Sequence, residues 1–211
     1  MRGRGIAALM LLALALGPGT SWLNHQDARW AQAISAALGT GWAWAVAAVL
    51  AGWIVTSRSG LGRLRWAAVA GAGVLVLAVL GYYASDYAYD RSSSSVSSQQ
   101  LPPGMPIPDP LATAWADARF WLMGALLTGP ALGVLGALTR RNGRTALLAA
   151  LAVPLLPIAE LTMLVHTAAP QTAQDRFGLR VRIVTLALAL VWLITVPIVQ
   201  RAREAKSPRH P

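Results

Sequence analysis

The sequence predicts an all-α membrane protein, a polytopic bundle of six transmembrane helices. Two observations support this prediction. The first is a set of six apolar segments, each close to the roughly 20 residues that a helix needs to cross a bilayer core; they occupy residues 5–23, 41–56, 66–83, 120–139, 145–167 and 182–200. The second is the placement of the charged residues between these segments. Residues 1–211 are therefore expected to form a single integral membrane domain.

The charged residues predict the orientation. If both termini lie in the cytoplasm, 12 of the 18 Lys and Arg fall on the inner side, four of them in a basic tail at residues 201–211. This excess satisfies the positive-inside bias. Six of the eight acidic residues fall on the outer side instead. The weakest support comes from the outer loop before the last span, which is as basic as two of the inner loops because it holds Arg176, Arg180 and Arg182.

The net charge of +10 also bears on the partners. In a soluble protein such a charge would suggest nucleic acid. Here the excess lies in short inner loops and a tail, where it attracts anionic lipid head groups at roughly 1 kcal/mol per residue. The expected partner is therefore the lipid bilayer, with anionic head groups at the cytoplasmic face, and not nucleic acid. The chain has no cysteine, which excludes thiolate metal sites and disulfides, and we expect neither a metal nor a cofactor.

The first apolar segment allows two interpretations. Two arginines precede the unbroken apolar residues 6–16, which is also the pattern of a signal peptide, with a cleavage site before or at Gly17. Alternatively, one helix continues through Gly17 and Pro18 to residue 23. The poor cleavage signal favours a retained first span.

A short amphipathic helix is expected after the first span, at residues 24–38, lying at the outer interface. Trp30, Ile34 and Leu38 recur at every fourth position, which places them on one face of a helix. Tryptophans and tyrosines near the ends of several spans fit interfacial aromatic belts. They include Trp42, Trp66, Tyr82, Tyr83, Trp115 and Trp121.

The only long connection is predicted between the third and fourth spans, as an extracytoplasmic loop over residues 84–118. A run of serines and a Pro-rich segment cannot bury a core, so residues 91–108 are expected to be disordered. Asp109 followed by Pro110 is typical of a helix N-terminus. We therefore expect a helix that begins there and either lies on the outer surface or runs into the fourth span.

Small residues recur at four-residue spacing in the fourth span, at Ala125, Gly129, Gly133 and Ala137. This spacing lets two helix backbones approach closely, which drives helix association in lipid. The sequence does not distinguish a contact inside the bundle from one between two copies, although a six-helix bundle needs such internal contacts.

The fifth span holds the strongest functional candidate, Glu160, the only acidic residue inside a predicted span. Intramembrane acids are costly, and they often mark proton or ion pathways; a neutral structural carboxyl is the alternative. Its partners should come from the outer ends of other spans. The candidate polar site thus consists of Glu160, Tyr82, Tyr83, Thr128, Arg119 and Arg182, with His166 nearby. His25 and His210 are isolated in the sequence, so no metal-site spacing is present.

Several short motifs resemble a known family. They are Gly81-Tyr82-Tyr83, Phe120-Trp121, Gly129-Pro130, Gly133, Gly136 and Glu160. The chain resembles small multi-pass membrane proteins, mostly actinobacterial, that are classified only as a domain of unknown function. The resemblance covers most of residues 42–160 and lapses at 92–110. It implies a bacterial plasma membrane protein, and no functional residues, because the family has no assigned activity.

Two classes of function remain. We expect a non-enzymatic membrane protein, either a structural interaction bundle or one that handles a small solute or ion through a site near Glu160. The alternative is a membrane-embedded enzyme that acts on lipid. The chain has no phosphate loop, no nucleophile elbow and no paired intramembrane acids, so no catalytic residues are predicted.

Overall fold

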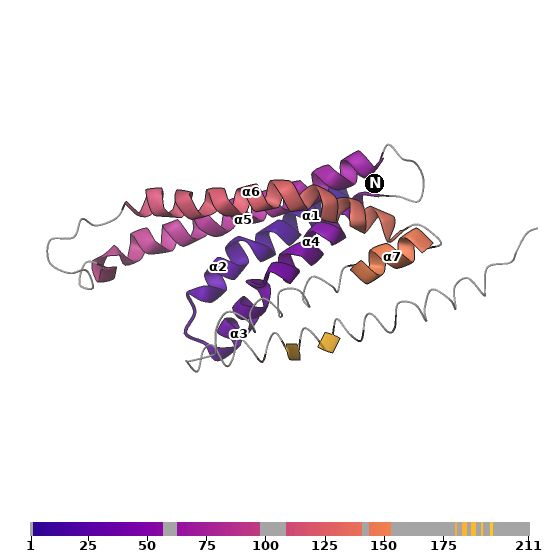
Figure 1. Cartoon of the computed structure of the whole chain (residues 1–211). Helices are drawn as coiled ribbons and strands as arrows, with labels where there is room; N and C mark the ends of the chain where they lie inside the picture. Colours follow the sequence, from indigo (N-terminus) through magenta and orange to yellow (C-terminus); the bar gives the residue numbers. More distant parts are fainter. Residues whose placement is uncertain are drawn as a thin grey trace, which may run out of the picture.

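The computed structural model describes residues 2–56, 63–97, 109–140 and 144–152, with isolated positions between Arg180 and Thr195. These residues form helices and their short connections, without a strand (Figure 1). The helices are α1 (Arg2–Leu16), α2 (Pro18–Asn24), α3 (Arg29–Leu38), α4 (Gly41–Val55), α5 (Arg63–Ser97), α6 (Pro110–Leu138) and α7 (Arg144–Ala152). The prediction of an all-α protein is thus confirmed for the described residues.

Three helical stretches of the described residues are long and apolar enough to cross a membrane: Gly5–Asn24, Leu64–Ser92 and Leu111–Leu138. A fourth is obtained if α3 and α4, which meet at a bend of 63°, count as one span. These helices indicate a membrane-embedded protein. They correspond to the first four predicted spans. Most of the two remaining ones, at residues 145–167 and 182–200, lies outside the described residues.

The first predicted span is broken between α1 and α2. Pro18 has no backbone N–H, so it cannot donate to the carbonyl of Leu14, and the helical backbone is interrupted at Gly17 although residues 5–24 remain one apolar stretch. A methyl group on Gly17 would overlap with the backbone of Ala78 in α5. The break therefore lies where the chain passes directly over α5, and only glycine permits that approach.

Helix α3 begins at Arg29, later than the predicted start at residue 24. Its buried side consists of Ala31 and Ser35, which are 0 and 4% exposed. The predicted apolar face points away from the other helices, since its residues Trp30 and Ile34 are 59 and 45% exposed. An exposed apolar face on this short connecting helix suits a helix in contact with lipid.

Helices α5 and α6 are longer than predicted and run side by side in antiparallel directions, extending past α2 at one end (Figure 1). The segment predicted as a loop, residues 84–118, is helical up to Ser97 in α5 and again from Pro110 in α6, where a helix was expected. The expected disorder is wrong for residues 91–97, while 98–108 lie outside the described residues. Helix α6 still packs against the bundle just before its predicted apolar segment, since Ala118 is only 3% exposed.

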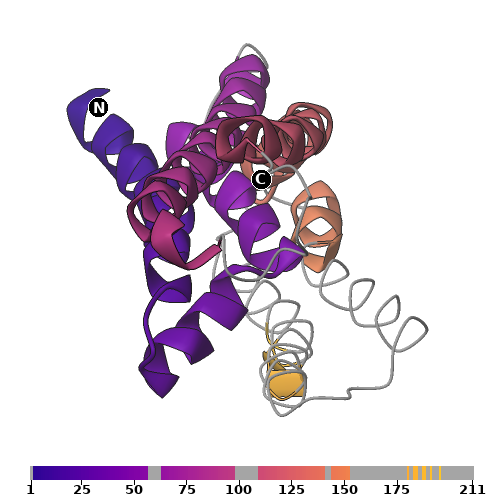
Figure 2. The same ribbon diagram turned by 90° about the vertical axis from the view of Figure 1, so that its left-hand side faces the viewer.

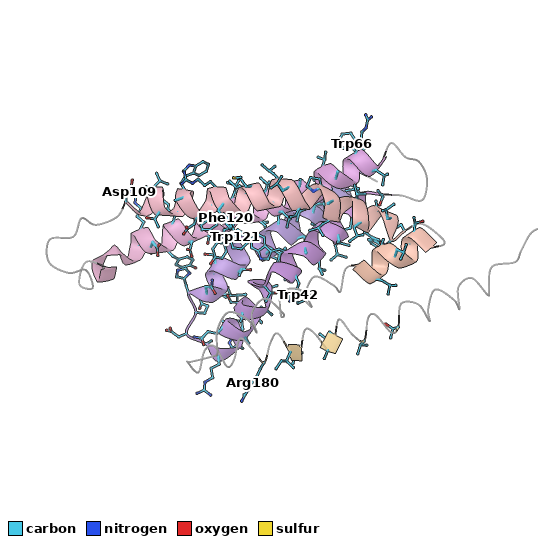
Figure 3. The ribbon with its side chains drawn as sticks, in the orientation of Figure 1. Trp42, Trp66, Asp109, Phe120, Trp121 and Arg180 are labelled. Atoms are coloured by element: carbon cyan, nitrogen blue, oxygen red, sulfur yellow. The ribbon has the colours of Figure 1, made fainter. Side chains whose placement is uncertain are left out.

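The start of α6 matches the prediction for Asp109 and Pro110. The Asp109 carboxylate accepts a hydrogen bond of 3.0 Å from the backbone N–H of Leu111, and Pro110 occupies the first helical position. Of the two alternatives for this helix, the structure shows the one that runs on into the fourth span. Further along α6, the outward side is apolar: Phe120, Met123 and Leu127 are at least 63% exposed (Figure 3).

The centre of the bundle is a seam of glycines and alanines where α5 and α6 touch through their backbones. A methyl group on Gly71 of α5 would overlap with the carbonyl oxygen of Gly129 in α6. One on Gly133 would overlap with the carbonyl oxygen of Ala67. Such contacts replace side-chain interdigitation with direct backbone packing, which is the means of helix association in lipid.

Helix α4 joins the same seam from the other side. A methyl group on Gly52 would overlap with the carbonyl of Gly133, and one on Gly136 would overlap with the carbonyl of Val49. We call the contacts of Gly52, Gly71, Gly129, Gly133 and Gly136 the glycine seam. In the view of Figure 2, α1 and α7 lie on opposite sides of this three-helix group.

We expect Gly71→Ala to lower the free energy of unfolding by about 1–3 kcal/mol, because the added methyl group forces the backbones of α5 and α6 apart. Gly73 is a matched control two residues away, since no atom lies within 4 Å of a methyl group placed there. Gly73→Ala should be neutral or stabilising by roughly 0.5–1 kcal/mol, because alanine is the better helix former. Thermal unfolding in detergent measures both, and equal effects would argue against the seam.

Candidate functional site

A polar network joins three helices where α2 ends. The side-chain amide of Asn24 donates to the hydroxyl of Tyr82 in α5 at 3.0 Å. The hydroxyl of Ser35 in α3 donates to the side-chain oxygen of Asn24. A single residue at the end of α2 thus bonds to α3 and α5 at once.

A second link between α2 and α5 involves Ser21, His25 and Asp86. The Ser21 hydroxyl donates to Oδ1 of Asp86 at 3.3 Å, and Nε2 of His25 lies 3.8 Å from the same oxygen. Nδ1 of His25 lies 2.8 Å from the backbone carbonyl of Ser21. The ring of Tyr89 stacks on the imidazole, with centroids 4.2 Å apart. We call Ser21, His25, Asp86 and Tyr89 the His25 cluster.

The His25 cluster contains the residue types of a hydrolase triad without its geometry. In a triad the imidazole accepts the proton of the serine hydroxyl and donates its other N–H to the carboxylate. Here the hydroxyl of Ser21 bonds directly to Asp86, and Nδ1 of His25 bonds to a backbone carbonyl. The serine is also fully buried. The arrangement holds α2 against α5 and does not activate a nucleophile.

The other end of the bundle is held by Arg140, just beyond α6. Its guanidinium donates to the backbone carbonyl of Thr56, the residue that caps α4, and lies 4.0 Å above the ring of Trp53. A cation at a helix C-terminus satisfies an unpaired carbonyl and complements the helix dipole. Arg140 therefore fixes the end of α4 to the end of α6.

The structure brings together only part of the predicted polar site. Tyr82 and Tyr83 are in edge-to-face contact, with ring centroids 5.2 Å apart, and Tyr82 belongs to the network of Asn24. Thr128 is exposed, and its hydroxyl donates to the carbonyl of Gly124 in its own helix. Arg119 is exposed as well. Among the described residues, no hydrogen bond or ion pair joins Thr128 or Arg119 to either tyrosine.

The remaining members of the predicted site, Glu160, His166 and Arg182, lie outside the described residues. The orientation of Glu160 toward the bundle interior therefore stays a prediction. The predicted packing residues are described, and all four lie on the buried side of α6, where Gly129 and Gly133 belong to the glycine seam. These four residues are Ala125, Gly129, Gly133 and Ala137.

The sequence interpretation missed the polar residues at the end of α2 and treated His25 as isolated. One local signal was available, since Ser21 and His25 are four residues apart and so lie on one face of a helix. Tyr82 and Asp86 have the same spacing in α5. What the spacing does not show is that these two faces meet, because that depends on how α2 is placed on α5.

Comparison with known proteins adds nothing to these observations: no family model, no curated protein and no solved structure matches the chain. The polar site must be judged by its own geometry. Within residues 2–97 and 109–152, as far as they are described, no group of three His, Cys, Asp or Glu is placed to hold a metal ion.

We expect the hydrogen bonds of Asn24 to show coupling in a double-mutant cycle. Tyr82→Phe removes one bond and should cost about 1 kcal/mol, whereas Asn24→Ala removes two and should cost about twice as much. The double variant should be no less stable than Asn24→Ala alone, since the bond lost in Tyr82→Phe is already absent. Thermal unfolding in detergent measures each step.

Tyr87→Phe, on the same helix, is the matched control for this cycle. No hydrogen bond of the Tyr87 hydroxyl is described, so its combination with Asn24→Ala should be additive within about 0.5 kcal/mol. Additivity for Tyr82→Phe as well would mean that Asn24 does not join α2 to α5.

Proposed function

We propose that the protein is a non-enzymatic structural bundle of a bacterial plasma membrane. The observation that supports this most directly is the glycine seam. Where the backbones of α4, α5 and α6 are in contact, the space between these helices is too small for water or an ion. A core of this kind gives rigidity, which suits a scaffold or an interaction protein better than a carrier.

The polar groups at the two ends of the bundle support the same proposal. Asn24, Ser35 and Tyr82 bond to one another, and Arg140 bonds to the end of α4. These groups are used to connect helices. Solute or ion handling near Glu160 and lipid chemistry are the competing hypotheses, and the described residues provide no observation that favours either.

The proposed topology has six spans with both termini in the cytoplasm. Arg140 bonds to Thr56 where α6 and α4 end, and α5, whose first residues are Arg63, Leu64 and Arg65, begins at the same end of the bundle (Figure 1). At the opposite end acidic residues outnumber basic ones: Asp27, Asp86, Asp90, Asp109 and Asp117 lie there with Arg29, Arg91 and Arg119. This segregation of charge supports a basic end in the cytoplasm and an acidic end outside.

Anionic lipid is the proposed partner at the basic end. Trp66 is 64% exposed and follows Arg65, which is exposed as well (Figure 3). An exposed indole beside a guanidinium suits the head-group level of a membrane, where each basic residue contributes roughly 1 kcal/mol.

Several of the residues that resemble the actinobacterial multi-pass family have structural roles in this chain. Gly129, Gly133 and Gly136 belong to the glycine seam, and Tyr82 bonds to Asn24. If the chain is a member, its motifs preserve helix packing. This would fit a family defined by a shared scaffold.

The topology can be tested on a single helix because the chain has no native cysteine. We expect Asp90→Cys to react with a membrane-impermeant maleimide in intact cells, whereas Arg65→Cys reacts only after the membrane is opened. Both positions are exposed and lie on α5. The reverse pattern would show that the bundle has the opposite orientation. Labelling of both positions in intact cells would show that α5 does not cross the membrane.

A purely structural protein should not make membranes permeable to protons or other cations. Vesicles containing the full chain should lose a proton or cation gradient no faster than protein-free vesicles, as reported by an enclosed pH-sensitive dye. A leak that Glu160→Gln abolishes would establish ion handling instead. Conversion of added phospholipid, detected by mass spectrometry, would establish the enzyme.

A further inference from the structure

We propose that His25 and Asp86 form a proton-binding site that fastens the corner between α2 and α3 onto α5 when the proton is bound. The site consists of described residues alone, and its chemistry depends neither on the scaffold function nor on the topology. The hydrogen bonds of His25 fix its tautomer. The carbonyl oxygen of Ser21 can only accept a hydrogen bond, so Nδ1 of His25, at 2.8 Å, must bear a hydrogen.

The tautomer of His25 determines whether Nε2 presents a lone pair or an N–H to Asp86. In a neutral imidazole with its hydrogen on Nδ1, Nε2 presents a lone pair, and here it lies 3.8 Å from Oδ1 of Asp86. That oxygen accepts the hydrogen of the Ser21 hydroxyl, as a carboxylate oxygen does. Two electron-rich atoms thus face each other. A proton on Nε2 turns this contact into an ion pair.

The end of α2 favours the same protonation. His25 is the C-cap of α2, where the helix dipole attracts positive charge. Tyr89 of α5 covers one face of the imidazole and holds its plane in place. The positive charge of the ring is therefore met by a carboxylate on one side and by the carbonyl end of a helix on the other.

The charges around this contact are balanced apart from Asp86. Asp90 lies one turn beyond Asp86 in α5 and is followed by Arg91, while Tyr89 is the titratable group stacked on the ring. The connection after α2 holds Asp27, and α3 begins with Arg29. Asp27 and Asp90 favour the protonated ring and the two arginines oppose it, so Asp86 is the charge that matters most.

Release of the proton leaves the corner with fewer attachments. The hydrogen bonds of Ser21 to Asp86, of Asn24 to Tyr82 and of Ser35 to Asn24 remain, but the contact of His25 with Asp86 is no longer attractive. Residues 26–28 are outside any helix. We therefore expect α3, with its exposed Trp30 and Ile34, to be held closely below neutral pH and to gain freedom above it.

The first test is nitrogen NMR of histidine in the full chain in detergent. His166→Gln and His210→Gln leave His25 as the only histidine. Both ring nitrogens should be protonated at pH 5, and Nδ1 alone at pH 8.5. Asp86→Asn should leave Nδ1 protonated at pH 8.5, because the bond of Nδ1 to the Ser21 carbonyl remains. Protonation of Nε2 alone at pH 8.5, or absence of a proton from Nε2 at pH 5, would overturn the proposal.

The second test measures the corner itself. Spin labels at Gln32→Cys in α3 and Ala88→Cys in α5, both exposed positions, report their separation by pulsed electron spin resonance. The distribution should be narrow at pH 5.5 and broader at pH 8.5. With His25→Gln added it should be the same at both values. A response to pH that survives His25→Gln, or no response in the native sequence, would contradict the proposal. If His25→Gln does not fold, the NMR titration decides, because it is carried out with His25 in place.

Discussion

Contact between helix backbones at the glycine seam is the interaction on which the rest of the structure depends. In a bilayer, apolar side chains gain little by leaving lipid for protein, so helices associate through close packing. Gly71, Gly129 and Gly133 allow α5 and α6 to approach until carbonyl groups meet the opposite backbone. Helix α4 reaches the same seam through Gly52. The positions of the three helices are thus set by where glycines occur, and the polar contacts at the ends follow from that placement.

Each end of this core is closed by one side chain that serves several helices. Asn24 bonds to α3 and α5, and Arg140 bonds to the capping residue of α4 while it covers Trp53. Hydrogen bonds of this kind define direction and register more sharply than packing of apolar surfaces does. The seam therefore fixes the distance between helices, and the end contacts fix how far each helix can slide along its neighbour.

The sequence was sufficient for the features that depend on local pattern. Apolar length located the helices, the Asp109 cap located the start of α6, and four-residue spacing located Gly129 and Gly133. It failed where a helix leaves the apolar region, since α5 continues to Ser97 against the local composition. It also missed His25 and Asp86. Their contact joins residues 61 positions apart, and no local pattern contains the placement of α2 on α5.

The bend between α3 and α4 has a consequence for depth in the membrane. At about 1.5 Å per residue, the 15 residues of α4 rise roughly 22 Å, which is short of a hydrocarbon core of about 30 Å. The 10 residues of α3, inclined at 63° to α4, add roughly 7 Å along the same direction. The bent pair therefore reaches nearly the full thickness that α4 alone does not.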